Sequence, residues 1–317
     1  MAMRTERGAA LIVCLWTLAL LSMLALGLAY RMTLELRLTR YQQEAIQLVQ
    51  MAKAALVFSR EAAGASSGHS ALNQKWSHDP ELMARRELMG GTLTWSHDAA
   101  SGRFETQALN GLSDEESRIN LNTASPEVLA RLPGLDADLA AAIVDWRDPD
   151  KEPLAAGTEE YEGYEARNGP FLSVDELLLV KGVSPERFAK ARPWLSVHGS
   201  GKVNVNTASP ETLTALGMEE DLLIKVLDFR RGEDMEAATE DDGVFKSVPS
   251  ISQDLSVSMD LGPEELKNLS QLAGQLTVRS TYFRADLTAR RGRVSRRYTV
   301  VFATDAKEKI AYWHESS

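Results

Sequence analysis

The chain has 317 residues, a formal net charge of −10, 44% hydrophobic residues and 7% aromatic residues. A chain of that length predicts about two domains, and the composition excludes an intrinsically disordered chain, a collagen-like chain and a multi-span membrane protein. The single cysteine excludes an internal disulfide framework and any metal site built from several cysteines. The net acidity argues against a nucleic-acid-binding protein, because phosphate binding needs a basic face.

The charge is distributed unevenly along the chain. Residues 1–60 carry a formal charge of +4 and residues 277–297 carry +6, whereas residues 61–276 carry −19. An acidic middle therefore lies between a basic N-terminal segment and a basic segment near the C-terminus.

An uncharged run near the N-terminus predicts one membrane span. Ala9–Tyr30 comprises 22 residues without a charge, and at about 1.5 Å per residue such a helix crosses a hydrocarbon core of about 30 Å. Arg4 and Arg7 precede the run, so the positive-inside rule places the N-terminus in the cytoplasm and the rest outside. A cleaved secretory signal shares these features, but this run is longer than a typical signal and lacks a small-residue cleavage site. A plain single-span anchor is the simplest alternative.

Beyond the span the sequence has the pattern of an amphipathic helix. Apolar residues recur every three or four positions, at Leu34, Leu38, Tyr41, Ala45, Leu48, Ala52, Ala55 and Phe58. No Gly or Pro interrupts the chain between Gly27 and Gly64. The sequence predicts one continuous helix over residues 9–62, about 75 Å long, that begins in the bilayer and ends in a folded head.

The residues before the span resemble a processed leader. Met1–Gly8 is short and basic, ends in Glu6-Arg7-Gly8 and joins the apolar run directly. This resembles the leader of type IV pilins and type II secretion pseudopilins, in which a membrane aspartyl peptidase cuts after the glycine and methylates the new N-terminus. The resemblance implies cleavage between Gly8 and Ala9 and N-methylation of Ala9.

Val13 marks a departure from most pilins. It would be the fifth residue of the mature chain, where most pilins carry a glutamate that is thought to neutralise the amine of a neighbouring subunit. A charge buried among apolar helices is costly unless it is paired, so a subunit without it need not dock beneath another. The K class of pseudopilins, of the general secretion pathway protein K type, lacks this glutamate and has a large head. The chain resembles this class over nearly its whole length.

Alternating segments at both ends of the head predict strands. Residues 92–97 and 103–109 are expected to form a hairpin around Asp98–Gly102. The C-terminal strands are expected at residues 275–288, 295–303 and 309–313. Because no strand is obvious between these groups, we expect one sheet interrupted by an inserted domain. We interpret the arginine-rich segment Arg290–Arg297, the one basic patch of the head, as a solvated hairpin tip.

The insert contains an internal repeat. Ile119–Leu129 recurs as Val203–Leu213, with six consecutive identities in the stretch Asn-Thr-Ala-Ser-Pro-Glu. The repeated stretch predicts a short strand, a serine N-cap and a proline in the first helical turn. We expect two copies of a small helical unit, over residues 119–197 and 203–274.

Two short segments of the first copy suggest a competing function. Leu132–Asp136 and Val180–Ser184 resemble the hairpins of helix-hairpin-helix DNA-binding domains, in which a Gly-hydrophobic-Gly turn directs backbone amides at a phosphate. Here the second glycine is replaced by Asp136 in one hairpin and by Ser184 in the other. An aspartate at that position repels phosphate, as does the acidic segment around it, so the topology is expected without DNA binding.

An acidic loop in the first copy is a candidate calcium site. Calcium takes six to eight oxygen ligands from closely spaced carboxylates and carbonyls. The candidate ligands are Asp145, Asp148, Asp150, Glu159, Glu160 and Asn168. The spacing is not that of an EF-hand, and a solvated acidic loop is the plain alternative. K-class pseudopilins have an Asp-Trp-x-Asp-x-Asp segment with calcium nearby, so the resemblance implies Ca²⁺, although the following Glu-Glu-Tyr-Glu-Gly-Tyr departs from the class pattern.

Enzymatic motifs are absent from the sequence. It has no Gly-x-Ser-x-Gly, P-loop, dinucleotide fingerprint or His-Glu-x-x-His, and its five histidines are scattered. His97 and His314 are interpreted as surface residues at strand ends. We therefore expect no catalytic residue and no enzyme activity.

The predicted fold class is α+β. A long N-terminal transmembrane helix packs on a pilin-like antiparallel sheet, which a large helical insert with two helix-hairpin-helix or SAM-like repeats interrupts. The predicted parts are a leader at 1–8, the helix at 9–62 with its membrane part at 9–30, the head at 63–118 and 275–317, and the insert at 119–274.

The resemblance implies a minor pseudopilin of the type II secretion system. Such a subunit is held in the inner membrane with its head in the periplasm, is processed by the prepilin peptidase and meets the inner-membrane platform. It assembles with the I and J class pseudopilins and initiates or caps the pseudopilus for export across the outer membrane. Leu11, Leu15 and Leu18 would pack against partner helices. The alternative is a single-span periplasmic protein that binds or takes up DNA through its helix-hairpin-helix units.

Overall fold

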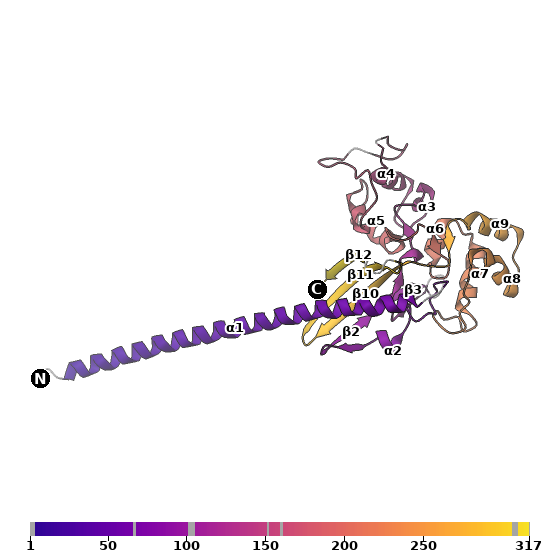
Figure 1. Ribbon diagram of the computed structural model, residues 1–317. Coiled ribbons are helices and arrows are strands. Elements are labelled where there is room, and N and C mark those ends of the chain that lie inside the picture. Colours follow the sequence, from indigo (N-terminus) through magenta and orange to yellow (C-terminus); the bar gives the residue numbers. More distant parts are fainter. Residues whose placement is uncertain are drawn as a thin grey trace.

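A computed structural model shows one long helix that extends away from a folded head (Figure 1). The described residues are 4–65, 68–100, 105–150, 152–158, 161–305 and 310–316. The helix α1 spans Arg4–Gly64 without a break, as the absence of proline and the helical periodicity predict. Its N-terminal half projects alone, whereas its C-terminal part lies against the head (Figure 1).

The C-terminal part of α1 packs on an antiparallel sheet. Leu48, Met51, Ala52 and Ala55 are fully buried in this contact. Among the described residues the sheet has six strands in the order β1-β2-β10-β11-β12, with β5 also paired to β10. Their bounds are β1 (Arg86–Leu88), β2 (Gly91–Trp95), β5 (Ser113–Asp114), β10 (Tyr282–Arg291), β11 (Val294–Ala303) and β12 (Ile310–Ser316).

Strand alternation separates an apolar from a polar sheet face. Phe283, Ala285, Leu287 and Ala289 of β10 point into the core shared with α1, as a period of two requires. The opposite face of the same strand is polar and carries, among others, Arg284. The short helix α2 (Pro80–Met83) precedes the sheet.

The predicted strand at residues 92–97 is wrong in its extent and its partner. The chain leaves the sheet at Ser96, and the next strand β3 (His97–Ala100) pairs instead with β4 (Thr106–Leu109). The reason is that β10 is already occupied: β2 pairs with its residues 287–290, and β5 pairs with its residues 283–284. No edge of β10 remains for β3.

The expected strand over residues 275–288 also divides in two. Its first part is β9 (Leu276–Thr277), which pairs in parallel with β8 (Val203–Asn204) of the insert. Only from Tyr282 does the chain join the main sheet as β10. The second copy of the repeat therefore ends at Thr277, three residues beyond its predicted end.

The insert consists of two similar helical units that share one apolar core. Each unit opens and closes with a pair of parallel two-residue strands, β6 with β7 and β8 with β9. The first unit comprises β6 (Ile119–Asn120), α3 (Pro126–Ala130), α4 (Ala137–Arg147), η2 (Val174–Leu179), α5 (Pro185–Ala191), η3 (Arg192–Trp194) and β7 (Leu195–Ser196). The second comprises β8, α6 (Pro210–Leu216), α7 (Glu220–Arg231), η4 (Val248–Ser250), α8 (Ile251–Ser258), α9 (Pro263–Leu272) and β9.

The repeated motif performs the same structural task in both units. Asn122 donates to the carbonyl of Phe171 (3.1 Å) and accepts from its amide (2.7 Å). Asn206 makes the same pair of bonds to Phe245, both at 2.9 Å. The serine N-caps are also as predicted, since Ser209 Oγ accepts from the amide of Thr212 (3.2 Å). The conserved spacing within the chain thus reflects folding rather than chemistry.

Three consecutive buried carboxylates join the insert to the head. Asp114, Glu115 and Glu116 are each at most 3% exposed, at the end of β5 and the start of the 3-10 helix η1 (Glu115–Ser117). A buried carboxylate is tolerated only where hydrogen bonds replace its hydration. We refer to these three residues as the carboxylate junction.

Asp114 connects the head to the second unit. Its Oδ2 accepts hydrogen bonds from Asn204 Nδ2 (2.9 Å), Thr207 Oγ1 (2.6 Å) and Ser280 Oγ (2.6 Å). Its Oδ1 accepts from the amide of Glu116 (2.8 Å). One carboxylate therefore ties the start of the second unit to the chain entering β10.

The two glutamates connect the head to the first unit and to the linker between the units. Glu115 accepts a hydrogen bond from the hydroxyl of Ser196 in β7. Glu116 accepts from the amide of Ser200 in the linker (2.8 Å) and from the amide of Thr281 before β10 (2.5 Å). The junction thereby fixes both units to the same end of the sheet.

The junction predicts a pH-dependent stability. Burial raises the pKa of Asp114 to about 6, although the hydrogen bonds from Ser280 and Thr207 oppose the rise. The unfolded chain has a pKa near 4, so the native state binds the proton more tightly, and the free energy of unfolding falls by about 3 kcal/mol as the pH rises through this window. Asp114→Asn has no titrating group at this position, so its free energy of unfolding relative to wild type should rise by about 3 kcal/mol between pH 4 and pH 7.

Chemical unfolding of the full chain in mild detergent at the two pH values measures this difference. Glu105→Gln changes an exposed carboxylate and serves as the control. A pH-independent difference for Asp114→Asn, equal to that of the control, would contradict the assignment.

Candidate functional site: the exposed apolar helix and the acidic loop

The N-terminal half of α1 exposes a long apolar surface. Leu11, Leu15 and Leu18 are 65%, 59% and 63% exposed, and the whole segment 9–30 lacks contacts with the described head. This is the one helix in the described part of the chain that is long and apolar enough to cross a membrane. An apolar surface of this size requires lipid or other helices to cover it.

The predicted processing and missing-glutamate positions lie within this helix. The bond between Gly8 and Ala9 falls in the second turn of α1, which begins at Arg4. Val13 is 61% exposed and lies among the apolar side chains of the span. The sequence has no acidic residue between Glu6 and Glu35, so an unpaired carboxylate is excluded from the apolar part.

Asp145 organises the start of the acidic loop. It is fully buried in the last turn of α4, and its carboxylate accepts hydrogen bonds from the amide of Leu154 at 3.1 and 3.3 Å. The loop returns so closely that a Cβ on Gly157 would overlap Asp145 Oδ2. Residues 152–157 therefore fold around this carboxylate, and only glycine fits at position 157.

Two further oxygens near the end of α4 are buried without a hydrogen-bond partner among the described residues. They are Asp148 Oδ1 and Asn168 Oδ1. Asn168 is held at this end of the helix because its amide donates to the carbonyl of Trp146 (3.0 Å), with a left-handed φ of 48°. Burial, followed by the charges of Asp150 and Asp145, raises the pKa of Asp148. Such an arrangement of orphaned oxygens and mutually repelling carboxylates is one that a bound cation would stabilise.

The remaining predicted ligands are not gathered with these oxygens. Asp150 is exposed and accepts a hydrogen bond from the amide of Glu152 (2.9 Å). Glu159 and Glu160 lie outside the described residues. Within the described ranges no three His, Cys, Asp or Glu side chains form a group that could hold a metal ion.

An aromatic cluster, which the sequence analysis did not identify, anchors the loop to the core. The rings of Trp146 and Tyr161 lie 5.1 Å apart, and those of Tyr161 and Tyr164 also lie 5.1 Å apart. The hydroxyl of Tyr164 donates to the carbonyl of Leu179 (2.8 Å). The density of tyrosines within the acidic stretch was the available signal, because aromatic side chains on a loop need a surface to pack on.

The acidic loop of the second unit satisfies its carboxylates internally. Asp241 accepts from the amides of Glu233 (2.7 Å) and Asp234 (3.1 Å), and the hydroxyl of Thr239 helps to lower its pKa to about 2. Asp242 accepts from the amide of Ala238 (2.8 Å). No orphaned carboxylate oxygen is found among the described residues of this loop, so it offers a metal ion less than the first loop does.

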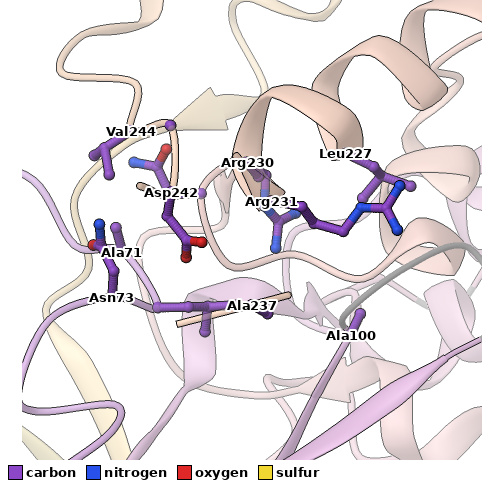
Figure 2. Close-up of a pocket in the computed structure, with 12 residues that line it drawn as sticks. Ala71, Asn73, Ala100, Leu227, Arg230, Arg231, Ala237, Asp242 and Val244 are labelled. Carbon is purple, nitrogen blue, oxygen red and sulfur yellow. The ribbon is translucent and has the colours of Figure 1, made fainter. Parts of the chain in front are cut away.

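A small pocket separates this second loop from the head (Figure 2). Ala71 and Asn73 of the head lie across it from Asp242, with Arg230 beside that carboxylate (Figure 2). Arg230 is buried, which lowers its pKa to about 10, and its Nη1 donates to the carbonyl of Ala208 (2.6 Å). The pocket therefore lies in the contact between the second unit and the head, and Arg230 holds the repeated stretch in place through Ala208.

The two hairpins that resemble a DNA-binding domain are closed by their own side chains. Asp136 Oδ1 accepts from the amide of Leu139 (3.0 Å) at the start of α4, and its Oδ2 pairs with Arg187 (2.6 Å). These two contacts lower the pKa of Asp136. The carboxylate thus occupies a helix amide and the guanidinium that a phosphate would need.

The two histidines that the sequence analysis singled out lie in different parts of the head. The interpretation of His97 as a surface residue is wrong, because its Nε2 lies 3.0 Å from the carbonyl oxygen of Ser77 and burial lowers its pKa. His314 is exposed in β12. The two residues occupy different sheets.

A family model, several sequence relatives and one solved structure point to the same family. A sequence-family model described as "Type II secretion system (T2SS), protein K" matches residues 103–200. The chain is 27% identical to the type II secretion system protein K of Aeromonas hydrophila, over 97% of this chain and 96% of that protein. It is 29% identical to the protein of the same name from Klebsiella pneumoniae, over 67% and 69% of the two chains.

The fold is also similar to a solved structure. A chain in the crystal structure of the GspK-GspI-GspJ complex from enterotoxigenic Escherichia coli superposes with a TM-score of 0.65 at 18% identity. The match covers 88% of this chain and 99% of that one. At this identity the likeness concerns the fold, a mixed arrangement of helices and sheet behind a long N-terminal helix.

Proposed function

We propose that this chain, which belongs to the type II secretion system protein K family and is a minor pseudopilin, forms the tip of the pseudopilus with I and J class pseudopilins. Its role is assembly, and we propose no catalytic step. The observation that carries the proposal is the exposed apolar half of α1, whose other half is fixed to the head. Such a helix can leave the bilayer only by exchanging lipid for the helices of other subunits.

The position of the insert supports a place at the tip. The insert lies at the end of the head that is far from the N-terminus of α1 (Figure 1). In a fibre whose helices run side by side, the insert would occupy the space that the head of the next subunit needs. Val13 fits the same placement, because a tip subunit has no neighbour above it whose amine requires a carboxylate.

The proposed topology follows from the basic leader. The apolar segment anchors the chain in the inner membrane, the N-terminus stays in the cytoplasm and the head lies in the periplasm. In this placement Cys14 lies in the bilayer, and the periplasmic part contains no thiol. The prepilin peptidase and the inner-membrane platform of the secretion system are the proposed partners at this stage.

The two helical units are proposed to be helix-hairpin-helix or SAM-like repeats that retain the topology without binding DNA. The closure of the first hairpin pair by Asp136 and Arg187 supports this view. A periplasmic DNA-uptake protein is therefore the less favoured alternative. Retention of the full chain on a DNA column at low salt would revive it.

The processing proposal predicts a defined N-terminus. When the chain is coexpressed with the matching prepilin peptidase, mass spectrometry of the purified protein should show a mature chain that starts at methylated Ala9. Gly8→Leu should remain at full length, because the peptidase requires the small residue before the cut. Any other N-terminus of the wild-type protein would contradict the proposal.

The assembly proposal predicts dependence on exposed apolar residues outside the membrane. Leu34 and Leu38 lie one turn apart on α1 and are 47% and 54% exposed. Their joint replacement by glutamate should reduce copurification of the full chain with coexpressed I and J class partners at least about tenfold, because a carboxylate between packed helices is costly.

The control places the same two charges on a polar part of the same helix. Gln42 and Gln43 are exposed in α1, and their replacement by glutamate should leave copurification unchanged. Equal yields of complex from both double variants would show that α1 does not contact the partners there.

We propose further that the first loop binds calcium. Asp148 and Asn168 would supply the two orphaned oxygens, and Asp145, Asp150, Glu159 and Glu160 are the other candidate ligands. Calcium would serve as a structural cross-link between the end of α4 and the returning loop. The support is the pair of partnerless buried oxygens, one of which belongs to Asp148, whose pKa is raised.

The calcium proposal predicts a metal-dependent melting temperature. In millimolar calcium the full chain in mild detergent should melt at least about 5 °C higher than in chelator. The reason is that a ligand at about 100 times its Kd adds about 2.7 kcal/mol to the free energy of unfolding. Asp148→Asn should abolish the difference. Asp234→Asn, in the second loop, should preserve it. A wild-type melting temperature that is the same in calcium and chelator would exclude a structural site.

A further inference from the structure

The turn between β10 and β11 concentrates positive charge. The segment Arg290–Arg297 contains five arginines and no acidic residue. Two of them are engaged: Arg291 donates to the carbonyl of Met89, and Arg296 pairs with Glu315 (3.2 Å) and contacts the hydroxyl of Tyr41. Within this segment, Arg291 and Arg296 are therefore bound to other parts of the same chain.

The other three arginines lack a counter-charge. Arg290, Arg293 and Arg297 are exposed and make no ion pair with any described residue. Arg290 and Arg297 lie on the sheet face opposite α1, because their strand neighbours Ala289 and Tyr298 point into the core. Arg293 lies at the turn itself. Mutual repulsion among these charges is not relieved within the chain, so the surface favours an acidic partner.

The location of the turn determines what can reach it. Gly292 lies against the carboxylate of Glu44, since a Cβ there would be 3.4 Å from Glu44 Oε1. In Figure 1 the turn points back along α1 toward its N-terminus. It thus faces the side of the head from which the exposed half of α1 emerges.

The lipid surface is too far away to be the natural occupant. Glu44 lies 14 residues beyond Tyr30, which at about 1.5 Å per residue is about 21 Å along the helix. The polar headgroup layer adds about 6 Å to the hydrocarbon core, and charges are screened beyond about 8 Å at physiological salt. A helix tilt of about 20° changes this distance little.

A partner subunit, in contrast, has to pass this point. Any subunit whose helix covers the exposed half of α1 emerges from the membrane beside residues 31–44, directly below the turn. We propose that Arg290, Arg293 and Arg297 form a docking surface for an acidic patch on the head of the minor pseudopilin that packs along α1. This inference rests on the proposed assembly and adds the chemistry of the contact.

Charge reversal with a matched control tests the proposal. In the full chain, Arg290→Glu, Arg293→Glu and Arg297→Glu together change the charge by −6. So do Lys181→Glu, Lys202→Glu and Lys246→Glu, which alter three exposed lysines of the insert that make no ion pair with described residues.

The first variant should reduce copurification with coexpressed I and J class partners about tenfold at physiological salt, and the control should retain it. The triple Arg→Lys variant should also retain it, because it keeps the positive charge that the partner requires. Equal yields from both charge-reversed variants would overturn the docking surface while leaving the assembly proposal intact. Failure of the wild-type chain to copurify would overturn both.

Trypsin distinguishes a protein partner from lipid, because it cleaves after arginine. The full chain is placed in nanodiscs of phosphatidylcholine alone or with phosphatidylglycerol, with and without the partners. Cleavage within residues 290–297 should be slowed only when the partners are present, in either lipid. Slower cleavage caused by phosphatidylglycerol alone would assign the surface to the membrane and overturn the proposal.

Discussion

The carboxylate junction at Asp114, Glu115 and Glu116 is the constraint on which the arrangement of the molecule depends. Its three buried side chains receive donors from both units of the insert, from the linker between them and from the chain that enters β10. Without these bonds the ionised carboxylates could not remain buried. The insert is therefore held at one end of the sheet, and the long helix leaves from the other (Figure 1).

This arrangement lets one chain serve two different surroundings. The N-terminal half of α1 is apolar and exposed, so it belongs in lipid or among other helices, whereas the acidic insert belongs in water. The acidic loops of the two units also differ from each other. The first loop has buried oxygens without partners at Asp148 and Asn168, whereas the carboxylates of the second loop accept bonds from their own backbone.

Local patterns in the sequence predicted the long helix, the serine caps and the duplication, because each depends on residues only a few positions apart. The division at Ser96 could not be predicted, because it depends on the pairing of β5 with residues 283–284 of β10, the next part of the same strand edge. The junction could not be predicted either, because the side-chain donors to Asp114 lie 90 to 166 residues away. Three consecutive acids in a sequence resemble a surface loop. The family resemblance, confirmed by the comparisons, supplied the function that local patterns could not.

The central claim is that the exposed half of α1 packs against the helices of other minor pseudopilins. Cys14 is the one cysteine of the chain, so it allows a direct test in membranes by oxidative cross-linking to cysteines placed one at a time along the apolar helix of an I class partner. The account predicts cross-links that recur every three or four positions of the partner helix. Cross-linking that is absent, or uniform at all positions, would contradict it.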